Sequence, residues 1–201
     1  MITVLYFNPN IYPEEEFLHR IAEQKRLIAE LPCKNPVSFE EHGWQQQRFY
    51  VVVRGLEEIR EGGERCFACY RLRLEETARL AAEGGYGYFT TTLSVSPYKN
   101  AVKLNEIGEE LAEKYGVAHL PSDFKKKDGY RRSIELSEKY GLYRQNYCGC
   151  IYSRQAASQS RVRSHLPTAA RCLPLGKKQS GFIDGRQDNE AEQHHRWEEG
   201  Q

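Results

Sequence analysis

The chain has 201 residues and a formal net charge of +1, with 39% hydrophobic and 28% charged residues. This length suits one domain with a core of its own and a short appendage. The composition indicates a soluble globular protein, and no apolar run approaches the roughly 20 residues that a membrane helix needs.

The N-terminus and the cysteine content indicate a compartment. The first ten residues, MITVLYFNPN, lack the basic segment followed by an apolar segment that marks a signal peptide. We therefore expect a cytoplasmic protein without membrane contact. Because cytoplasmic thiols are kept reduced, the six cysteines suggest metal or redox chemistry and not a disulfide framework.

Strands and helices alternate along the first 150 residues. The apolar segment 2–7 predicts a buried strand that stops at Asn8-Pro9-Asn10, and further strands are expected over 86–93 and 117–120. Apolar spacing predicts helices over 14–31, 44–56, 66–83, 99–116 and 129–141. The alternation predicts an α/β fold with an open, mainly parallel, Rossmann-like sheet flanked by helices.

The sequence changes character after Ser153. Residues 154–201 show little periodicity and are rich in Gln, Ser, Gly and Arg. We expect a domain over 1–153 and a disordered tail over 154–201. Cys172 and the pair His194-His195 lie in this tail, where an incidental role is the simpler interpretation.

A C-x-x-C motif, Cys66 and Cys69, opens the helix expected over 66–83. The two thiols are one turn apart on one helix face, at the end of the helix dipole that favours thiolates. The motif suits half a zinc site, half an iron–sulfur site or a redox pair, and two unrelated core cysteines are the alternative.

A second pair, Cys148 and Cys150, flanks Gly149. A disulfide between positions i and i+2 closes a very small ring, so it should be strained and easily reduced, as a reversible two-electron step requires. The reduced pair could also bind metal, or the thiols could be unrelated. Tyr147 beside them could stack on a base or close a hydrophobic core.

Polar side chains follow the strand expected over 86–93, in the segment TTTLSVSPYKN. Ligands of open α/β sheets bind beyond the carboxyl ends of strands, and hydroxyls with a lysine there suit an anionic or polyhydroxylated ligand. N-capping by Ser96 explains part of the pattern. The candidate ligand-binding residues are Thr91, Thr92, Ser94, Ser96 and Lys99.

The segment FKKKDGYRR concentrates positive charge, with five basic residues over 125–132. Lys126 and Arg131 in it are candidates for contacts with a phosphate backbone. A solvated loop followed by a helix start is the simpler alternative.

Together the segments GGERCFACYRLRL, YFTTTLSVSPYKN, DFKKKDGYRRSIELSEKYG and YCGCIYS resemble the QueH-type epoxyqueuosine reductases, from about Ile2 to Ser153. The resemblance implies an enzyme that reduces the epoxide of epoxyqueuosine at the wobble position of tRNA, giving queuosine. It implies a [4Fe–4S] cluster, leaves an additional iron open, and implies tRNA and an unidentified electron donor as partners. By the same resemblance, Cys66 and Cys69 match two cluster ligands, and Cys148 and Cys150 match a redox-active pair.

The chain departs from the family pattern at its start. Family sequences begin with a strand that ends in C-C-x-P-C and supplies two more cluster ligands, and we expect this chain to lack that element. An RNA-binding module with a structural zinc site made of all four cysteines is the main alternative. A metal-free thiol oxidoreductase is a third interpretation.

Overall fold

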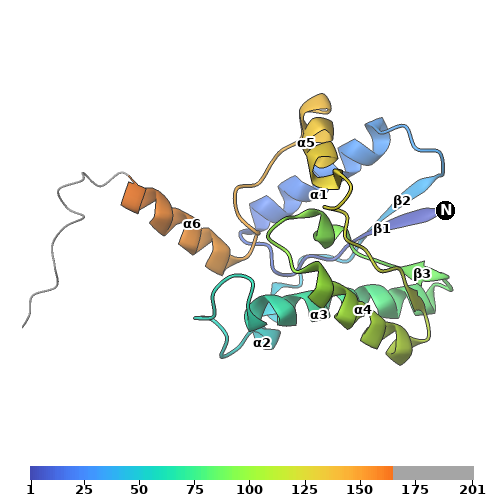
Figure 1. Cartoon of the computed structure of the whole chain (residues 1–201), viewed down its shortest axis with the longest axis horizontal. Coiled ribbons are helices and arrows are strands. Elements are labelled where there is room, and N and C mark those ends of the chain that lie inside the picture. Colours follow the sequence, from blue (N-terminus) through green and yellow to red (C-terminus); the bar gives the residue numbers. More distant parts are fainter. Residues whose placement is uncertain (165–201) are drawn as a thin grey trace, which may run out of the picture. The chain divides into compact units, whose positions relative to one another are not determined.

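Two pairs of parallel strands organise the fold (Figure 1). The computed structural model describes residues 1–164. Strand β1 (Ile2–Tyr6) pairs with β2 (Val37–Glu41), and β3 (Tyr88–Phe89) pairs with β4 (Ala118–His119). The parallel pairing confirms the α/β prediction, although the described strands form two separate pairs where we expected one sheet.

Helices connect these strands. They are α1 (Glu14–Glu30), α2 (Gln46–Val52), α3 (Glu64–Glu83), the 3-10 turn η1 (Thr92–Val95), α4 (Ala101–Tyr115), α5 (Gly129–Lys139) and α6 (Ile151–Ser164). No helix in the described part of the chain combines the length and the apolar character needed to cross a membrane.

One core lies between α3 and α4. Leu104, Ile107 and Leu111 form an apolar stripe along α4, and they pack with Leu74 of α3. Gly116 ends α4 in the left-handed conformation, with φ of +67°. The predicted cap at Ser96 is wrong, because the helix begins later and its N-cap is Asn100, whose side chain accepts the Lys103 N–H.

A second core brings the cysteine pairs together. Phe7, from the end of β1, packs with Phe49 of α2 and with Cys69 of α3, and Cys150 belongs to the same cluster. This packing carries the end of the chain's first strand, the C-x-x-C helix and the C-G-C segment to one place.

The tail prediction is wrong for its first residues. Residues 154–164 continue α6, which begins at Ile151, and the segment 151–164 contains no Gly or Pro to interrupt a helix. The rest of the predicted tail, 165–201, lies outside the described residues, as do Cys172 and His194-His195.

Candidate active site

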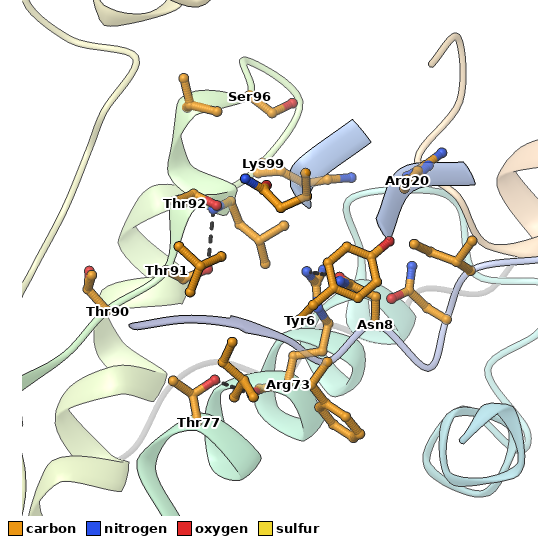
Figure 2. Close-up of a pocket in the computed structure, with 18 of the residues that line it drawn as sticks. Tyr6, Asn8, Arg20, Arg73, Thr77, Thr90, Thr91, Thr92, Ser96 and Lys99 are labelled. Atoms are coloured by element: carbon orange, nitrogen blue, oxygen red, sulfur yellow. Dashed lines mark hydrogen bonds between the residues drawn. The ribbon is translucent and has the colours of Figure 1, made fainter. Parts of the chain in front are cut away.

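A cavity of about 1680 Å³ lies between the β1 edge and the segment that follows β3. Figure 2 shows the side chains that line it from β1, from the η1 segment and from α3. Its walls include the whole of β1, Arg73 and Thr77 of α3, and Cys148 from the C-G-C segment. Hydroxyls, amides, cations and a thiol therefore share one large space at the carboxyl ends of two strands.

The four cysteines of the two motifs lie within electrostatic reach of one another. Cys148 interacts with Cys66 and Cys69, and Cys150 interacts with Cys69 and Cys148. All four are free thiols. The Gly62 N–H lies 3.3 Å from Cys66 Sγ, and the Ser153 N–H lies 3.4 Å from Cys150 Sγ.

Burial keeps the C-x-x-C pair protonated. It raises the pKa of Cys66, and it raises the pKa of Cys69 to about 12. A metal that binds these sulfurs must therefore displace two protons.

The C-G-C pair is asymmetric. The hydrogen bond that Cys150 donates lowers the pKa of Cys148, burial opposes this, and the charge of Lys99 lowers it further. The same hydrogen bond, together with burial, raises the pKa of Cys150. Cys148 is thus the thiolate of the pair and Cys150 the thiol.

Lys99 is the cation beside Cys148. Its Nζ lies 3.1 Å from Cys148 Sγ and 3.0 Å from Glu61 Oε1. Burial by itself would lower the pKa of Lys99, but the charge of Cys148 and the hydrogen bonds to Cys148 and Glu61 raise it. The ammonium form is therefore retained although only 9% of the residue is exposed.

A second polar group lies at the end of β1, in the part of the cavity drawn in Figure 2. The Arg73 guanidinium donates to Asn8 Oδ1. The hydroxyl of Tyr6 and Oδ1 of Asn10 are buried, and neither has a hydrogen-bond partner among the described residues. This group offers both donors and an acceptor to a hydroxylated ligand.

Comparison with known proteins identifies the relatives of this fold and site. The model of the family described as epoxyqueuosine reductase QueH matches residues 1–156. The chain belongs to the QueH family. This confirms the resemblance stated above.

Three curated relatives, each named epoxyqueuosine reductase QueH, show the range of similarity. The protein of Streptococcus pyogenes serotype M1 is 44% identical over 154 residues, which are 76% of this chain and 60% of the relative. That of Staphylococcus epidermidis is 41% identical over 156 residues, 76% of this chain and 66% of the relative. That of Thermotoga maritima is 34% identical over 167 residues, 80% of this chain and 86% of the relative. The chain thus spans less than two thirds of the length of the first two.

The structure brings together most of the residues that the sequence singled out. Thr91, Thr92, Ser96, Lys99 and Tyr147 all line the cavity with Cys148. Ser94 is instead fully buried, and its hydroxyl bonds to Ser122. It therefore positions the loop and does not face a ligand.

Lys126 and Arg131 lie apart from the cavity wall. Their side chains are 76% and 73% exposed, on the loop before α5 and on α5 itself, and they pair with Asp123 and Glu135. Exposed cations of this kind suit an extended polyanion better than a small buried ligand.

Sequence reasoning missed Tyr6, Glu61 and Arg73. Arg73 follows Cys69 by one helical turn, and this spacing was the available signal. Glu61 precedes the glycines before the C-x-x-C motif, and nothing in that local pattern indicates that it meets Lys99.

The cofactor that the family resemblance implies can be tested against these side chains. Cys66 and Cys69 fit as two thiolate ligands of an iron–sulfur cluster, which takes four. The described residues contain no group of three or more His, Cys, Asp or Glu side chains placed to hold a metal ion. The fit is therefore limited to these two ligands, and the geometry does not favour a zinc site made of all four cysteines.

Proposed function

We propose that this chain reduces the epoxide of epoxyqueuosine in tRNA, giving queuosine. Its membership of the QueH family supports this. The observation that carries the proposal is the placement of Cys148, next to Cys150, on the wall of a cavity lined by hydroxyls and amides.

The electron balance fits a dithiol. Removal of the epoxide oxygen as water consumes two electrons and two protons and leaves an alkene. Oxidation of the Cys148 thiolate and the Cys150 thiol to a disulfide releases two electrons and one proton, and solvent supplies the second proton. The pair can therefore supply one turnover, after which an external electron donor must reduce it again.

The cavity residues hold the reacting ring. We infer that Thr91, Thr92 and Ser96 bind hydroxyl groups of the substrate, and that Tyr147 covers the ring. Burial raises the pKa of Tyr6 to about 12, so its hydroxyl is protonated at neutral pH and suits a hydrogen bond to a substrate oxygen.

Cys66 and Cys69 are the residues that would hold an iron–sulfur cluster. When bound, such a cluster supplies electrons one at a time. The additional iron stays a prediction. We also propose that Lys126 and Arg131 contact the tRNA backbone and that the protein works in the cytoplasm, where tRNA is found.

The test is a single-turnover assay on tRNA that carries epoxyqueuosine. The protein is reconstituted anaerobically with iron and sulfide, and nucleosides are separated by mass after digestion. We expect queuosine from the wild type and none from Cys150→Ser, whereas Cys33→Ser, at an exposed thiol, keeps full yield. No queuosine from a wild type that has bound iron would contradict the proposed function.

The ligand assignment has its own readout. Cys66→Ser and Cys69→Ser should each lower the bound iron to a small fraction of the wild-type content, while Cys33→Ser leaves it unchanged. Equal iron in all of these variants would show that the C-x-x-C motif is not the binding site.

A further inference from the structure

Lys99 is an ammonium group in a nearly closed environment. A buried cation is costly unless it is paired. The two partners of Lys99 are Cys148 Sγ at 3.1 Å and Glu61 Oε1 at 3.0 Å. One partner is a carboxylate, and the other is a sulfur that lies on the cavity wall.

Four residues form a closed ring of hydrogen bonds around this contact, which we call the Lys99 network. Lys99 bonds to Cys148 and Glu61, and Glu61 Oε2 accepts the hydroxyl of Ser153 at 3.1 Å. The Ser153 hydroxyl in turn accepts the backbone N–H of Cys148 at 3.0 Å. Cys148 is thus held by both its sulfur and its backbone.

The ring joins three distant parts of the chain. Lys99 stands just before α4, Glu61 stands just before α3, and Ser153 belongs to the first turn of α6. A surface lysine samples many rotamers, whereas this one is fixed by elements that the fold itself places. The geometry is preorganised before any ligand arrives.

Other groups also face Cys148. Arg20 Nη1 lies 3.4 Å from the carbonyl oxygen of Cys148, so it acts on the backbone and not on the sulfur. The groups that interact electrostatically with the thiol, besides Lys99 and Glu61, are Cys150, Cys66, Cys69 and Tyr70. Of all these groups around the sulfur, including Lys99 and Glu61, it is Lys99 that carries a positive charge.

We propose that Lys99, fixed by Glu61, is a positioning residue that holds Cys148 as the thiolate, so that Cys148 reacts first and Cys150 second. This inference rests on the proposed redox use of the pair. Neither Lys99 nor Glu61 is assigned as a cluster ligand.

The order of events can be written for a small aromatic disulfide as oxidant. The Cys148 thiolate attacks one oxidant sulfur, the oxidant S–S bond breaks, and one aromatic thiolate leaves. Cys150 then loses its proton to solvent and attacks Cys148 Sγ, which expels the second aromatic thiolate and closes the Cys148–Cys150 bond. Two electrons pass from the pair to the oxidant.

The test measures alkylation by iodoacetamide in the reduced full chain. Alkylation forms a sulfur–carbon bond and releases iodide, and only the thiolate attacks at an appreciable rate. Peptide mass spectrometry gives the rate at each cysteine from pH 5 to pH 9. In the wild type at pH 6, we expect Cys148 to react faster than the exposed Cys33.

Variants separate charge from structure. Lys99→Met should lower the rate at Cys148 at pH 6 by tenfold or more and move the midpoint of its pH profile upward. Lys99→Arg keeps the positive charge and should retain most of the rate. Lys103→Met is the matched control, because Lys103 pairs with Glu106 and lies outside the Lys99 network.

Two results would overturn the inference. One is a wild type in which Cys148 reacts more slowly than Cys33 at pH 6, and this result needs no variant to fold. The other is a Lys99→Met profile that matches the wild type at Cys148. The tRNA assay is scored separately. If the wild type makes queuosine but Lys99→Met leaves the pH profile of Cys148 alkylation unchanged, only this inference is contradicted. If the wild type makes no queuosine but the alkylation profiles of Cys148 are as expected, only the proposed function is contradicted.

Discussion

At the scale of single residues, Tyr6 combines deep burial with an unsatisfied hydroxyl. It lines the cavity, is 8% exposed, and its oxygen has no hydrogen-bond partner among the described residues. A buried unpaired polar group costs stability, so the Tyr6 hydroxyl destabilises the free protein. A bound ligand that accepts a hydrogen bond from this hydroxyl would pair it.

This contrast predicts opposite effects of Tyr6→Phe on activity and stability. We expect kcat/KM for epoxide reduction to fall about fivefold, because one hydrogen bond contributes on the order of 1 kcal/mol, while the urea midpoint stays or rises. Tyr115→Phe is the control, since the Tyr115 hydroxyl donates to Glu75 at 3.1 Å. It should lose stability and keep activity. A Tyr6→Phe variant with wild-type kcat/KM would refute the assigned role.

His119 makes a prediction about pH. Both of its ring nitrogens are buried without partners among the described residues, and burial lowers the pKa of the ring. The folded state therefore disfavours the charged form. The unfolded chain takes up a proton as pH falls through about 6.5, so the stability contribution present above that pH is lost as pH falls further.

The measurement is urea unfolding at pH 7.5 and pH 5.5. We expect the wild type to lose stability over this interval and His119→Phe to lose less. His19→Gln, at an exposed histidine, should follow the wild-type slope. Parallel slopes for all three proteins would exclude His119 as the source.

The sequence revealed those site residues that belong to short motifs. Cys66, Cys69, Cys148 and Cys150 were recognisable because their spacing alone restricts what the sulfurs can do. The contact between Lys99 and Glu61 was not recognisable from the sequence, since 38 residues separate them. Only the packing of α3 against α4 brings them together.

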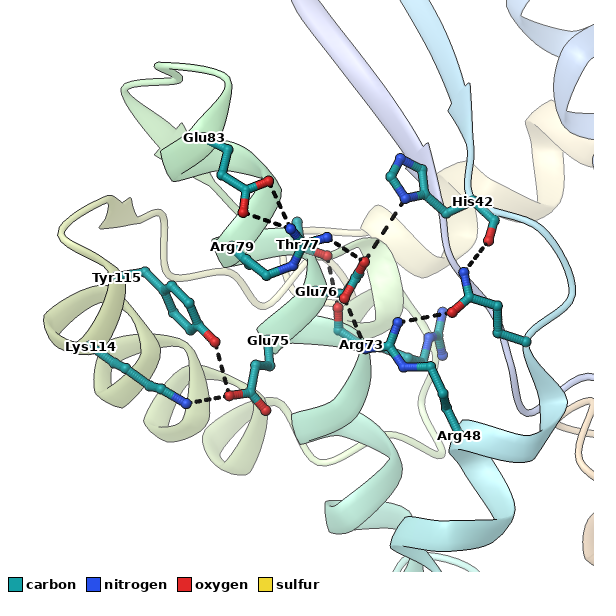
Figure 3. A network of polar contacts seen from close by, with 11 residues as sticks. His42, Arg48, Arg73, Glu75, Glu76, Thr77, Arg79, Glu83, Lys114 and Tyr115 are labelled. Carbon is teal, nitrogen blue, oxygen red and sulfur yellow. Dashed lines mark hydrogen bonds and ion pairs between the residues drawn. The ribbon is translucent and has the colours of Figure 1, made fainter.

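At the scale of elements, a polar network drawn in Figure 3 holds α3 to both of its helical neighbours. Glu75 accepts the hydroxyl of Tyr115 on α4, and Glu76 faces α2. The Glu76 carboxylate accepts hydrogen bonds from Arg79 at 2.8 Å and from Arg48, the residue that ties it to α2, at 2.9 Å. Burial would raise the pKa of Glu76, but these two hydrogen bonds lower it. The network thus fixes the helix that carries the C-x-x-C motif.

Replacing this carboxylate should destabilise the protein. We expect Glu76→Gln to lower the free energy of unfolding by about 1–3 kcal/mol, because a hydrogen-bonded charge that is 7% exposed is lost. Glu83→Gln removes a carboxylate that also pairs with Arg79 but is 59% exposed. It should cost less than about 0.5 kcal/mol. If urea unfolding shows equal losses in the free energy of unfolding for both variants, the burial of Glu76 adds nothing to its contribution to stability.

The elements were predictable where their periodicity is strong. The helices α1, α3, α4 and α5 follow the apolar spacing that predicted them. Strand β2, VSFEE, was missed because five largely exposed residues give almost no apolar signal, and its place is fixed by pairing with β1. Residues 154–164 of α6 were taken for a tail because the helix has no apolar stripe.

At the scale of the whole molecule, a net charge of +1 hides a local concentration of basic residues. The segment 124–132 leads into α5, and α5 packs against η1, whose residues Thr92 and Val95 line the cavity. A tRNA that places its wobble base in the cavity could therefore rest its backbone on this basic segment.

This arrangement predicts a measurable change in the salt dependence of tRNA binding. Lys126→Ala and Arg131→Ala should each weaken binding, and each should reduce the slope of log affinity against log salt by about 1 in magnitude, because one phosphate contact is lost. Lys114→Ala is the control, since Lys114 lies at the other end of α4 from η1 and pairs with Glu75. Filter binding of unmodified tRNA from 50 to 300 mM salt, roughly the range over which such contacts are screened, measures all three slopes. If the two variants keep the wild-type slope while Lys114→Ala loses it, the tRNA backbone approaches the molecule from the opposite end of α4.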